Sequence, residues 1–308
     1  RKSIDLINNY RGSNLSLASI PAEDKPTYEM LQEGDSIGVF HVESRAQMSM
    51  LPRLKPKNFY DLVIEVAIVR PGPIQGKMVH PYLKRRNGEE EISYANDDIK
   101  AVLERTLGVP IFQEQVIRLA VVAAGFSPGE ADQLRRAMAA WKRKGGLDHF
   151  QKKLITGMLD RGHSKEFAER IFDQIKGFGV YGFPESHAAS FALLVYISAW
   201  IKKHEPAAFY CGLLNSQPMG FYSPSQLIQD AHRHNIKILP VDIEKSRWES
   251  VLEPVEKKKK NYQEQACIRL GFHQIKGFKK NSALSIEEAR KDSSIKSIED
   301  VKKRAFLD

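Results

Sequence analysis

The sequence is poor in cysteine and has no long apolar run. Its two cysteines, Cys211 and Cys267, lie far apart and neither belongs to a C-x-x-C pair. This usage excludes a disulfide framework and a zinc site of ordinary spacing, and it favours a reducing, cytoplasmic location. The most apolar stretch, Ala188 to Ile201, is too short and too rich in serine to span a bilayer. We therefore expect a buried helix there and no membrane partner.

Signatures of common chemistry are also missing. The chain has no P-loop, no G-x-S-x-G nucleophile elbow and no alternating aspartate pair for two divalent ions, since Asp97 and Asp98 are adjacent. His232 and His234 are two apart, which points them to different faces of a helix. The sequence thus predicts no metal ligand, while arrangements of Ser, His and Asp or of Cys and His that only the fold would bring together stay open. Because the first residue is Arg rather than Met, we expect a piece of a longer protein.

Basic residues are what the sequence has in excess. It contains 47 Lys and Arg against 38 Asp and Glu, a net charge of +9 over 308 residues. Between Arg135 and Lys153 the cations are opposed only by Asp148. Clustered positive charge favours a polyanion partner, nucleic acid in particular.

The centre of this charge is a predicted helix from Ser127 to Gly146. Ser127 is a suitable N-cap and Glu130 can close a capping box with it. At 100° per residue, Leu134, Ala137, Met138 and Trp141 share one side, and the opposite half carries Arg135, Arg136, Lys142 and Arg143. This pattern favours a phosphate-binding face, and the alternative is a solvated basic surface.

The rest of the chain predicts a mainly α (α+β) fold. Helices are expected over 61–69, 111–124 and 164–177, from 186 onward and over 223–234, and strands over 38–42 and 236–241. After Trp248 we expect short extended pieces around a solvated loop at 257–260. We divide the chain into a connecting segment (1–60), a helical domain (61–218) and a small mixed α/β segment (219–308).

Three further places could bind a nucleotide. Arg70 is followed by Pro-Gly-Pro, which restrains the backbone that presents it, although it could simply cap the preceding helix. The segment 177–183 interleaves glycine with aromatic residues, so that a base could stack on it. His187 follows at a helix start, where it could donate to a phosphate or sit as a buried histidine. Gln113, Glu114 and Gln115 could hold a base or simply form a helical first turn.

Several motifs together resemble one family. Ser44-Arg45, Arg70-Pro71-Gly72-Pro73, Phe112–Gln115, Leu134–Met138, Tyr181–His187 and Ile238–Ile243 are similar in order and spacing to the C-family bacterial DNA polymerases, the DnaE-type polymerase III alpha subunits. Pro184–Phe191 and Leu214–Tyr222 resemble the error-prone, damage-inducible branch. The resemblance implies the fingers region of a DNA-directed DNA polymerase that acts in translesion synthesis and repair.

The resemblance also implies roles for individual residues. Arg135 and Arg136 are expected to bind the triphosphate of the incoming deoxynucleotide, with help from His187 and Arg70, and Tyr181 is expected to line the nascent base pair. The DNA-binding residues that it implies are Lys142, Arg143 and Lys144. The segment just before them, Ala139-Ala140-Trp141, departs from the family pattern of Gly and Lys.

By the same resemblance, Mg²⁺ would be held by palm aspartates outside this chain, so the fragment alone is expected to be inactive. The implied partners are template–primer DNA, deoxynucleoside triphosphates, the sliding clamp and damage-response accessory proteins. Two alternatives remain open. One is a non-enzymatic nucleic-acid-binding module, and the other is the fingers of the replicative alpha subunit.

Overall fold

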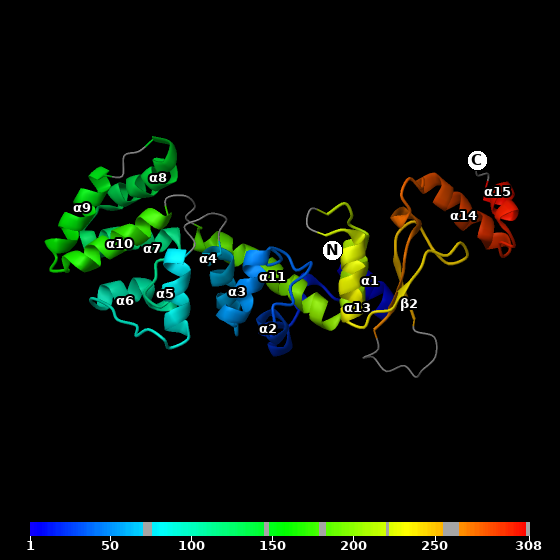
Figure 1. Ribbon diagram of the computed structural model, residues 1–308, viewed down its shortest axis with the longest axis horizontal. Coiled ribbons are helices and arrows are strands. Elements are labelled where there is room, and N and C mark those ends of the chain that lie inside the picture. Colours follow the sequence, from blue (N-terminus) through cyan, green and yellow to red (C-terminus); the bar gives the residue numbers. More distant parts are fainter. Residues whose placement is uncertain (70–75, 145–147, 179–182, 220–221, 255–264, 306–308) are drawn as a thin grey trace. The chain divides into compact units, whose positions relative to one another are not determined.

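Helices dominate the computed structural model, which describes residues 1–69, 76–144, 148–178, 183–219, 222–254 and 265–305 (Figure 1). The mainly α, α+β fold class is confirmed. No described helix is both long enough and apolar enough to cross a bilayer. The α-helices are α1 (Lys2–Arg11), α2 (Lys25–Gln32), α3 (Arg45–Leu54), α4 (Phe59–Ile68), α5 (Gly76–Arg86), α6 (Asp97–Leu103), α7 (Gln113–Ala124), α8 (Pro128–Lys144), α9 (Asp148–Leu159), α10 (Lys165–Phe178), α11 (Glu185–His204), α12 (Pro206–Leu214), α13 (Pro224–Arg233), α14 (Lys280–Asp292) and α15 (Ile298–Ala305).

The chain divides into two compact units. One consists of residues 28–35 and 41–196, and we call it the helical unit. The other consists of residues 1–27, 36–40 and 197–308, and we call it the sheet unit. The boundary between them falls within α11, so this helix contributes its first turns to the helical unit and its last turns to the sheet unit.

The core of the helical unit is built around α4 and α7. Every residue of α4 from Asp61 to Ile68 is buried. Helix α7 packs against α6, α8 and α9, and α9 packs against α10 (Figure 1). The crossing of α7 and α9 depends on Gly157, where a Cβ would come within 2.1 Å of the Ala124 carbonyl oxygen. Only glycine permits that approach, and it fixes how the helices before and after α8 meet.

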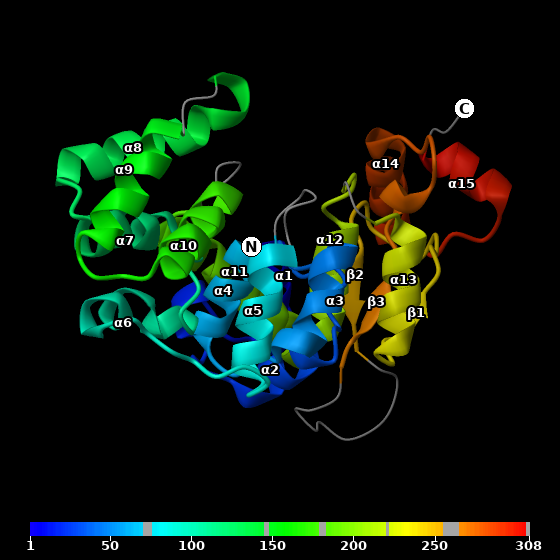
Figure 2. The ribbon, with the colours of Figure 1, turned by 60° about the vertical axis from the view of Figure 1, so that its left-hand side comes forward.

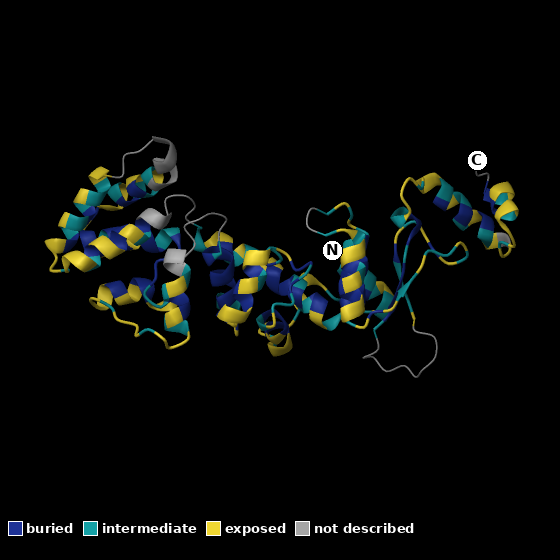
Figure 3. Cartoon of the chain, viewed as in Figure 1, coloured by how far each residue is buried: buried dark blue, intermediate teal, exposed yellow. Residues whose placement is uncertain are grey.

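The sheet unit combines three short strands with helices. Strands β1 (Ile238–Leu239) and β2 (Val251–Glu253) flank β3 (Cys267–Arg269), in parallel and antiparallel pairing respectively. Helix α12 packs against β2 and β3, α13 packs against β1, and Figure 2 shows these helices beside the strands. Figure 3 shows the two faces of α13, which buries Leu227 and Ala231 and exposes the opposite side.

Helices α14 and α15 close over a small apolar core of their own. Its buried residues are Phe272, Ala283, Ile286, Ala289, Val301 and Ala305. The short strands before and after residues 257–260 agree with the sequence-based prediction, whereas the two helices were not predicted. Residues 257–260 lie outside the described residues. Three of the five residues that the two helices bury in this core are alanines, whose small side chains make the apolar face less evident in the sequence.

Two sequence-based expectations need correction. Residues 38–42 form consecutive turns rather than a strand, because Gly38 and His41 adopt left-handed φ values of 74° and 65°, which no extended strand contains. The helix over Ala188–Ile201 is present but is buried on one face only. Leu193 and Leu194 are 51% and 44% exposed, whereas Ala188, Ala192 and Val195 lie on the buried face.

Candidate functional site

The basic helix begins as the sequence predicts. In α8 the Ser127 amide donates to the Glu130 carboxylate at 3.0 Å, and the Glu130 amide donates to the Ser127 hydroxyl at 3.3 Å. This reciprocal capping box satisfies two amides that the first helical turn leaves without partners. Leu134 is fully buried against the helical unit. The start and the rotation of α8 are therefore fixed by adjacent residues in the sequence.

A second contact ties α8 to α9. The Lys153 ammonium on α9 pairs with the Glu130 carboxylate. This hydrogen bond is the main cause that lowers the pKa of Glu130 to about 2, and the bonds from Ser127 add to it. Glu130 therefore stays ionised at any physiological pH, and one carboxylate serves both the cap and the helix–helix contact.

Arg135 and Arg136 share one carboxylate. Arg135 Nε and Nη2 both lie 2.9 Å from Oδ1 of Asp132, and Arg136 Nη2 lies 2.7 Å from Oδ2. The hydrogen bond from Arg135 holds the pKa of Asp132 below its usual value. The Arg136 side chain is 74% exposed and that of Arg135 is 38% exposed. Two guanidinium groups thus lie at the surface, with one net positive charge between them and Asp132.

The entry to α11 is fastened to α7 and α4. A parallel bridge pairs Phe112 with Phe183, and the Gln113 amide donates to the Phe183 carbonyl at 3.2 Å. Glu114 accepts a hydrogen bond of 3.0 Å from the Glu185 amide. Among Gln113, Glu114 and Gln115, the structure therefore gives Glu114 the task of capping the next helix.

Gln115 has a structural task as well. Its buried side chain accepts from the Ile111 and Phe112 amides at 2.8 and 3.0 Å, and it donates to the Thr106 hydroxyl at 2.7 Å. These bonds shape the turn that leads into α7. They explain why a glutamine is buried at position 115, and no bound base or sugar is needed to explain it.

Glu185 extends the same network. Its carboxylate accepts from the Tyr60 hydroxyl at 2.9 Å and pairs with Arg105 at 3.1 Å, while the Arg105 guanidinium lies 3.9 Å from the centre of the Tyr60 ring. Burial, and then the bond to Glu185, raise the pKa of Tyr60, so the phenol remains a donor. The first turn of α11 is held rigidly, and His187 lies within it.

His187 is exposed and packs among aromatic rings. Its ring centre lies 5.0 Å from that of Phe183 and 4.6 Å from that of Phe191. Helix α7 is the element common to both candidate groups, because it packs against α8 and its start is bridged to Phe183. No hydrogen bond or ion pair between described residues joins Arg135 or Arg136 to His187.

The other predicted site residues cannot be placed. Arg70 and Tyr181 lie outside the described residues. Lys142, Arg143 and Lys144 form the last turn of α8, and nothing of their side chains is described. Sequence reasoning also overlooked Asp132. Its spacing of three and four residues from the two arginines is the signal that could have found it.

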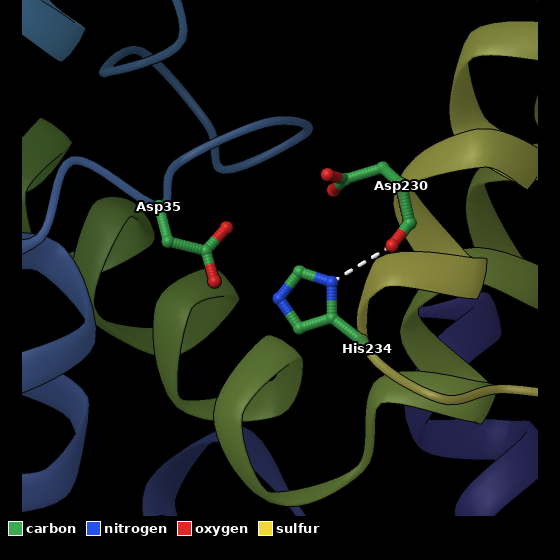
Figure 4. A group of neighbouring side chains, drawn as sticks. All are labelled: Asp35, Asp230 and His234. Carbon is green, nitrogen blue, oxygen red and sulfur yellow. Dashed lines mark hydrogen bonds between the residues drawn. The ribbon is translucent and has the colours of Figure 1, made fainter.

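A separate cluster of charged groups lies inside the sheet unit. The fully buried Lys202 ammonium lies 3.1 Å from the Asp230 carboxylate, which also accepts from the Tyr210 hydroxyl at 2.6 Å. Figure 4 shows His234 beside Asp230, with Nδ1 located 2.9 Å from the Asp230 carbonyl oxygen. Because the Lys202 charge already compensates this carboxylate, Asp230 and His234 do not suit a metal ion. They hold α13 against α11 and α12.

The comparisons with known proteins cover the whole chain. Residues 1–162 match the bacterial DNA polymerase III alpha subunit finger domain, and residues 235–308 match a helix-hairpin-helix motif. Error-prone DNA polymerases from Pseudomonas paraeruginosa, Pseudomonas aeruginosa and Methylococcus capsulatus are 62%, 60% and 57% identical over all of the chain. The chain spans about 30% of the length of these relatives.

The first match contains helices α1 to α9, and the second contains the small sheet with α14 and α15. Together the matches define a polymerase fingers module with a helix-hairpin-helix motif behind it. The chain belongs to the bacterial DNA polymerase III alpha subunit finger domain family. The predicted resemblance to the error-prone branch is confirmed by relatives of that name along its full length.

Proposed function

We propose that this chain is the fingers region of an error-prone DNA polymerase that performs DNA-templated nucleotidyl transfer during translesion synthesis and repair. The observation that carries the proposal is the full coverage of the chain by relatives that bear that name, at 57 to 62% identity. On this proposal residues 61–218 bind the nucleotide, 1–60 connect them to the catalytic palm, and 219–308 begin the module on the DNA side.

The proposed substrate contact is the exposed arginine pair of α8. A guanidinium offers a planar fork of donors that matches two phosphate oxygens, as it matches a carboxylate. Asp132 already occupies that geometry at 2.7 to 2.9 Å from both side chains. A triphosphate carries more charge than one carboxylate, so it can displace Asp132 and bind Arg135 and Arg136 in its place.

The remaining contacts are proposed from the family resemblance. His187 donates to the triphosphate, Arg70 adds a cation, and Tyr181 lines the nascent base pair. Lys142 to Lys144 contact DNA. The helix-hairpin-helix match supports DNA binding by the C-terminal part, and it motivates template–primer DNA as the second ligand.

A divalent metal belongs to the proposed polymerase activity, and we assign it as Mg²⁺ held by acidic residues outside this chain. When bound, the metal supplies charge neutralisation at the reacting phosphate. The residues of this chain bind and orient the nucleotide and exclude water. We further propose that the whole protein works in the cytoplasm with the sliding clamp and damage-response accessory proteins.

The proposal is tested by Arg135→Ala with Arg136→Ala in the complete polymerase. Loss of charged hydrogen bonds of about 1.5–3 kcal/mol each predicts a KM for deoxynucleoside triphosphate at least about tenfold higher, with an unchanged Kd for primer–template. The matched control is Arg118→Ala with Lys152→Ala, which removes the same charge from exposed positions on α7 and α9.

Measuring KM for the triphosphate and Kd for DNA separately distinguishes the polymerase fingers from a non-enzymatic nucleic-acid-binding module. If only the Kd for DNA rises, the non-enzymatic nucleic-acid-binding module is the better description. If neither constant changes beyond the control, the arginine pair is not part of the site. The isolated 308-residue chain is expected to show no Mg²⁺-dependent primer extension, and extension by a homogeneous sample would contradict the assignment of the catalytic residues to another part of the protein.

A further inference from the structure

The residues that precede α11 offer its first turn no side-chain cap. Phe183 and Pro184 come directly before Glu185, and neither side chain can accept a hydrogen bond from the amides of that turn. The Glu185 amide donates instead, at 3.0 Å, to the Glu114 carboxylate on α7, which lies 71 positions away in the sequence. The start of the helix that carries His187 is therefore set by another helix.

The Glu185 side chain binds two further elements of the helical unit. Its Oε1 accepts from the Tyr60 hydroxyl on α4 at 2.9 Å, and from Arg105 Nη1 in the turn after α6 at 3.1 Å. The Arg105 guanidinium also lies 3.9 Å from the centre of the Tyr60 ring. Three side chains from three elements thus form a closed triangle, in which each contacts the other two.

The triangle is stronger than an isolated surface ion pair. Its carboxylate is 32% exposed, and the hydrogen bonds that it accepts are charge-assisted. Burial, and then the bond to Glu185, raise the pKa of Tyr60, so the hydroxyl keeps its proton and remains a donor. An exposed pair of charges contributes little by itself, whereas linked contacts with good geometry hold their members in place. The first turn of α11 is therefore restrained from α4, α7 and the turn after α6.

His187 depends on this restraint for its position. It follows Glu185 by two residues, in the same turn of α11. Its ring packs between Phe183 and Phe191, with ring centres 5.0 and 4.6 Å apart. Neither ring nitrogen has a hydrogen-bond partner in the described part of the chain. Where the imidazole lies is thus decided by these two rings and by the backbone that Glu185 holds.

We propose that Glu185, Tyr60 and Glu114 are positioning residues for His187. They fix the first turn of α11 so that the imidazole meets the triphosphate bound by the arginine pair of α8. The inference rests on the proposed function, because it takes His187 to contact that triphosphate. A displacement of about 1 Å is enough to weaken such a contact, so the network acts on substrate binding without touching the substrate.

The test uses the complete polymerase and measures KM for deoxynucleoside triphosphate and the melting temperature. Glu185→Ala opens the triangle, and we expect KM to rise about fivefold, as it should in Glu114→Ala. Glu185→Gln keeps an oxygen for the Tyr60 hydroxyl and should stay within about twofold of the wild type. Tyr60→Phe removes one oxygen atom and keeps the ring beside Arg105. It should raise KM about threefold, and it keeps the test open if Glu185→Ala folds poorly.

Repeating these variants in a His187→Ala background separates positioning from a merely structural role. If Glu185 acts through the imidazole, removing the imidazole also removes its effect. The KM of the double variant should then equal that of His187→Ala. A merely structural role would lower the melting temperature and raise KM by the same factor in both backgrounds. That outcome, or a wild-type KM in both Glu185→Ala and Tyr60→Phe, would overturn the inference.

The matched control is Glu104→Ala, which removes the same charge from an exposed position next to Arg105 and should leave KM unchanged. An equal rise in Glu104→Ala and Glu185→Ala would mean that the lost charge matters and the lost contact does not. If the Glu185 and His187 variants are silent while Arg135→Ala with Arg136→Ala raises KM, only this inference fails. If all of them are silent, the proposed function fails.

Discussion

The two units handle ionic groups in opposite ways. In the helical unit, Arg135 and Arg136 meet Asp132 on one exposed helix, three and four residues apart. In the sheet unit, Lys202 meets Asp230 with both side chains buried and at a separation of 28 positions in the sequence. The contact of Arg135 and Arg136 with Asp132 is solvated, so another anion can replace the carboxylate. The buried pair is locked, because neither charge can leave its partner without a large desolvation cost.

The largest effect should come from breaking the buried pair. Lys202→Met removes the buried counter-charge of Asp230 and leaves it the mostly exposed Arg233 guanidinium at 3.6 Å, and we expect the complete protein to lose about 3–5 kcal/mol of stability in the unit that contains it. Thermal unfolding followed by calorimetry measures the loss. The matched control is Lys203→Met, which removes the same charge from an exposed neighbour and should leave the melting temperature nearly unchanged. Equal effects of the two variants would contradict the distinction between locked and solvated charges.

The next largest effect should come from Glu65, a buried carboxyl group that has no cationic partner in the described part of the chain. Glu65 on α4 is fully buried, and its carboxyl oxygens have no hydrogen-bond partner among the described residues. Burial raises the pKa of Glu65 in the folded protein well above 4.5, the value for the unfolded chain. As the pH rises past 4.5, the unfolded chain therefore releases this proton while the folded protein keeps it. Its stabilising contribution is complete below pH 4.5 and is lost toward the folded-state pKa, at about 1.4 kcal/mol per pH unit.

Glu65→Gln removes this titration. We expect the variant to gain stability relative to the wild type as the pH is raised from 5 to 8, measured as the difference in melting temperature at each pH. Glu33→Gln, at an exposed position, serves as control and should follow the wild type at both values. A constant difference between Glu65→Gln and the wild type across this range would contradict a neutral Glu65 in the folded state.

Changing Asp132, the partner of Arg135 and Arg136, should give the smallest change in stability and a measurable change in nucleotide binding. Asp132→Asn removes the carboxylate that occupies both arginines, so stability should shift by less than about 1 kcal/mol. The KM of the complete polymerase for deoxynucleoside triphosphate should fall, since one competing negative charge is gone. Asp148→Asn removes an exposed charge from α9 and is the control. A higher KM in Asp132→Asn would mean that Asp132 orients the arginines rather than competing for them.

The same contrast explains what the sequence could predict. Capping boxes at Ser127 with Glu130 and at Ser223 with Gln226 are local signals, and both helix starts are confirmed. The family resemblance is likewise confirmed, because it rests on several motifs in fixed order. The exposed arginine pair follows from helical spacing alone. Its role in binding a nucleotide stays a prediction.

Contacts between residues that lie far apart in the sequence could not be predicted, because they leave no local pattern in it. Nothing near Lys202 in the sequence pointed to Asp230 or to the Tyr210 hydroxyl. The strand predicted over 38–42 was wrong because alternating apolar residues outweighed a glycine, and the left-handed φ of His41 is set by contacts with α3 and α11.

The bridge between Phe112 and Phe183 has a consequence for how this fold can change. The chain leaves that point, makes the four helices α7 to α10, and returns to within one backbone hydrogen bond of where it started. The two ends of the α7–α10 segment are therefore neighbours, and this arrangement tolerates replacement of the whole segment. Lengthening this segment, or exchanging it between related polymerases, should leave the packing of α4 and α11 intact. Substrate preference can then diversify while the rest of the fold stays the same.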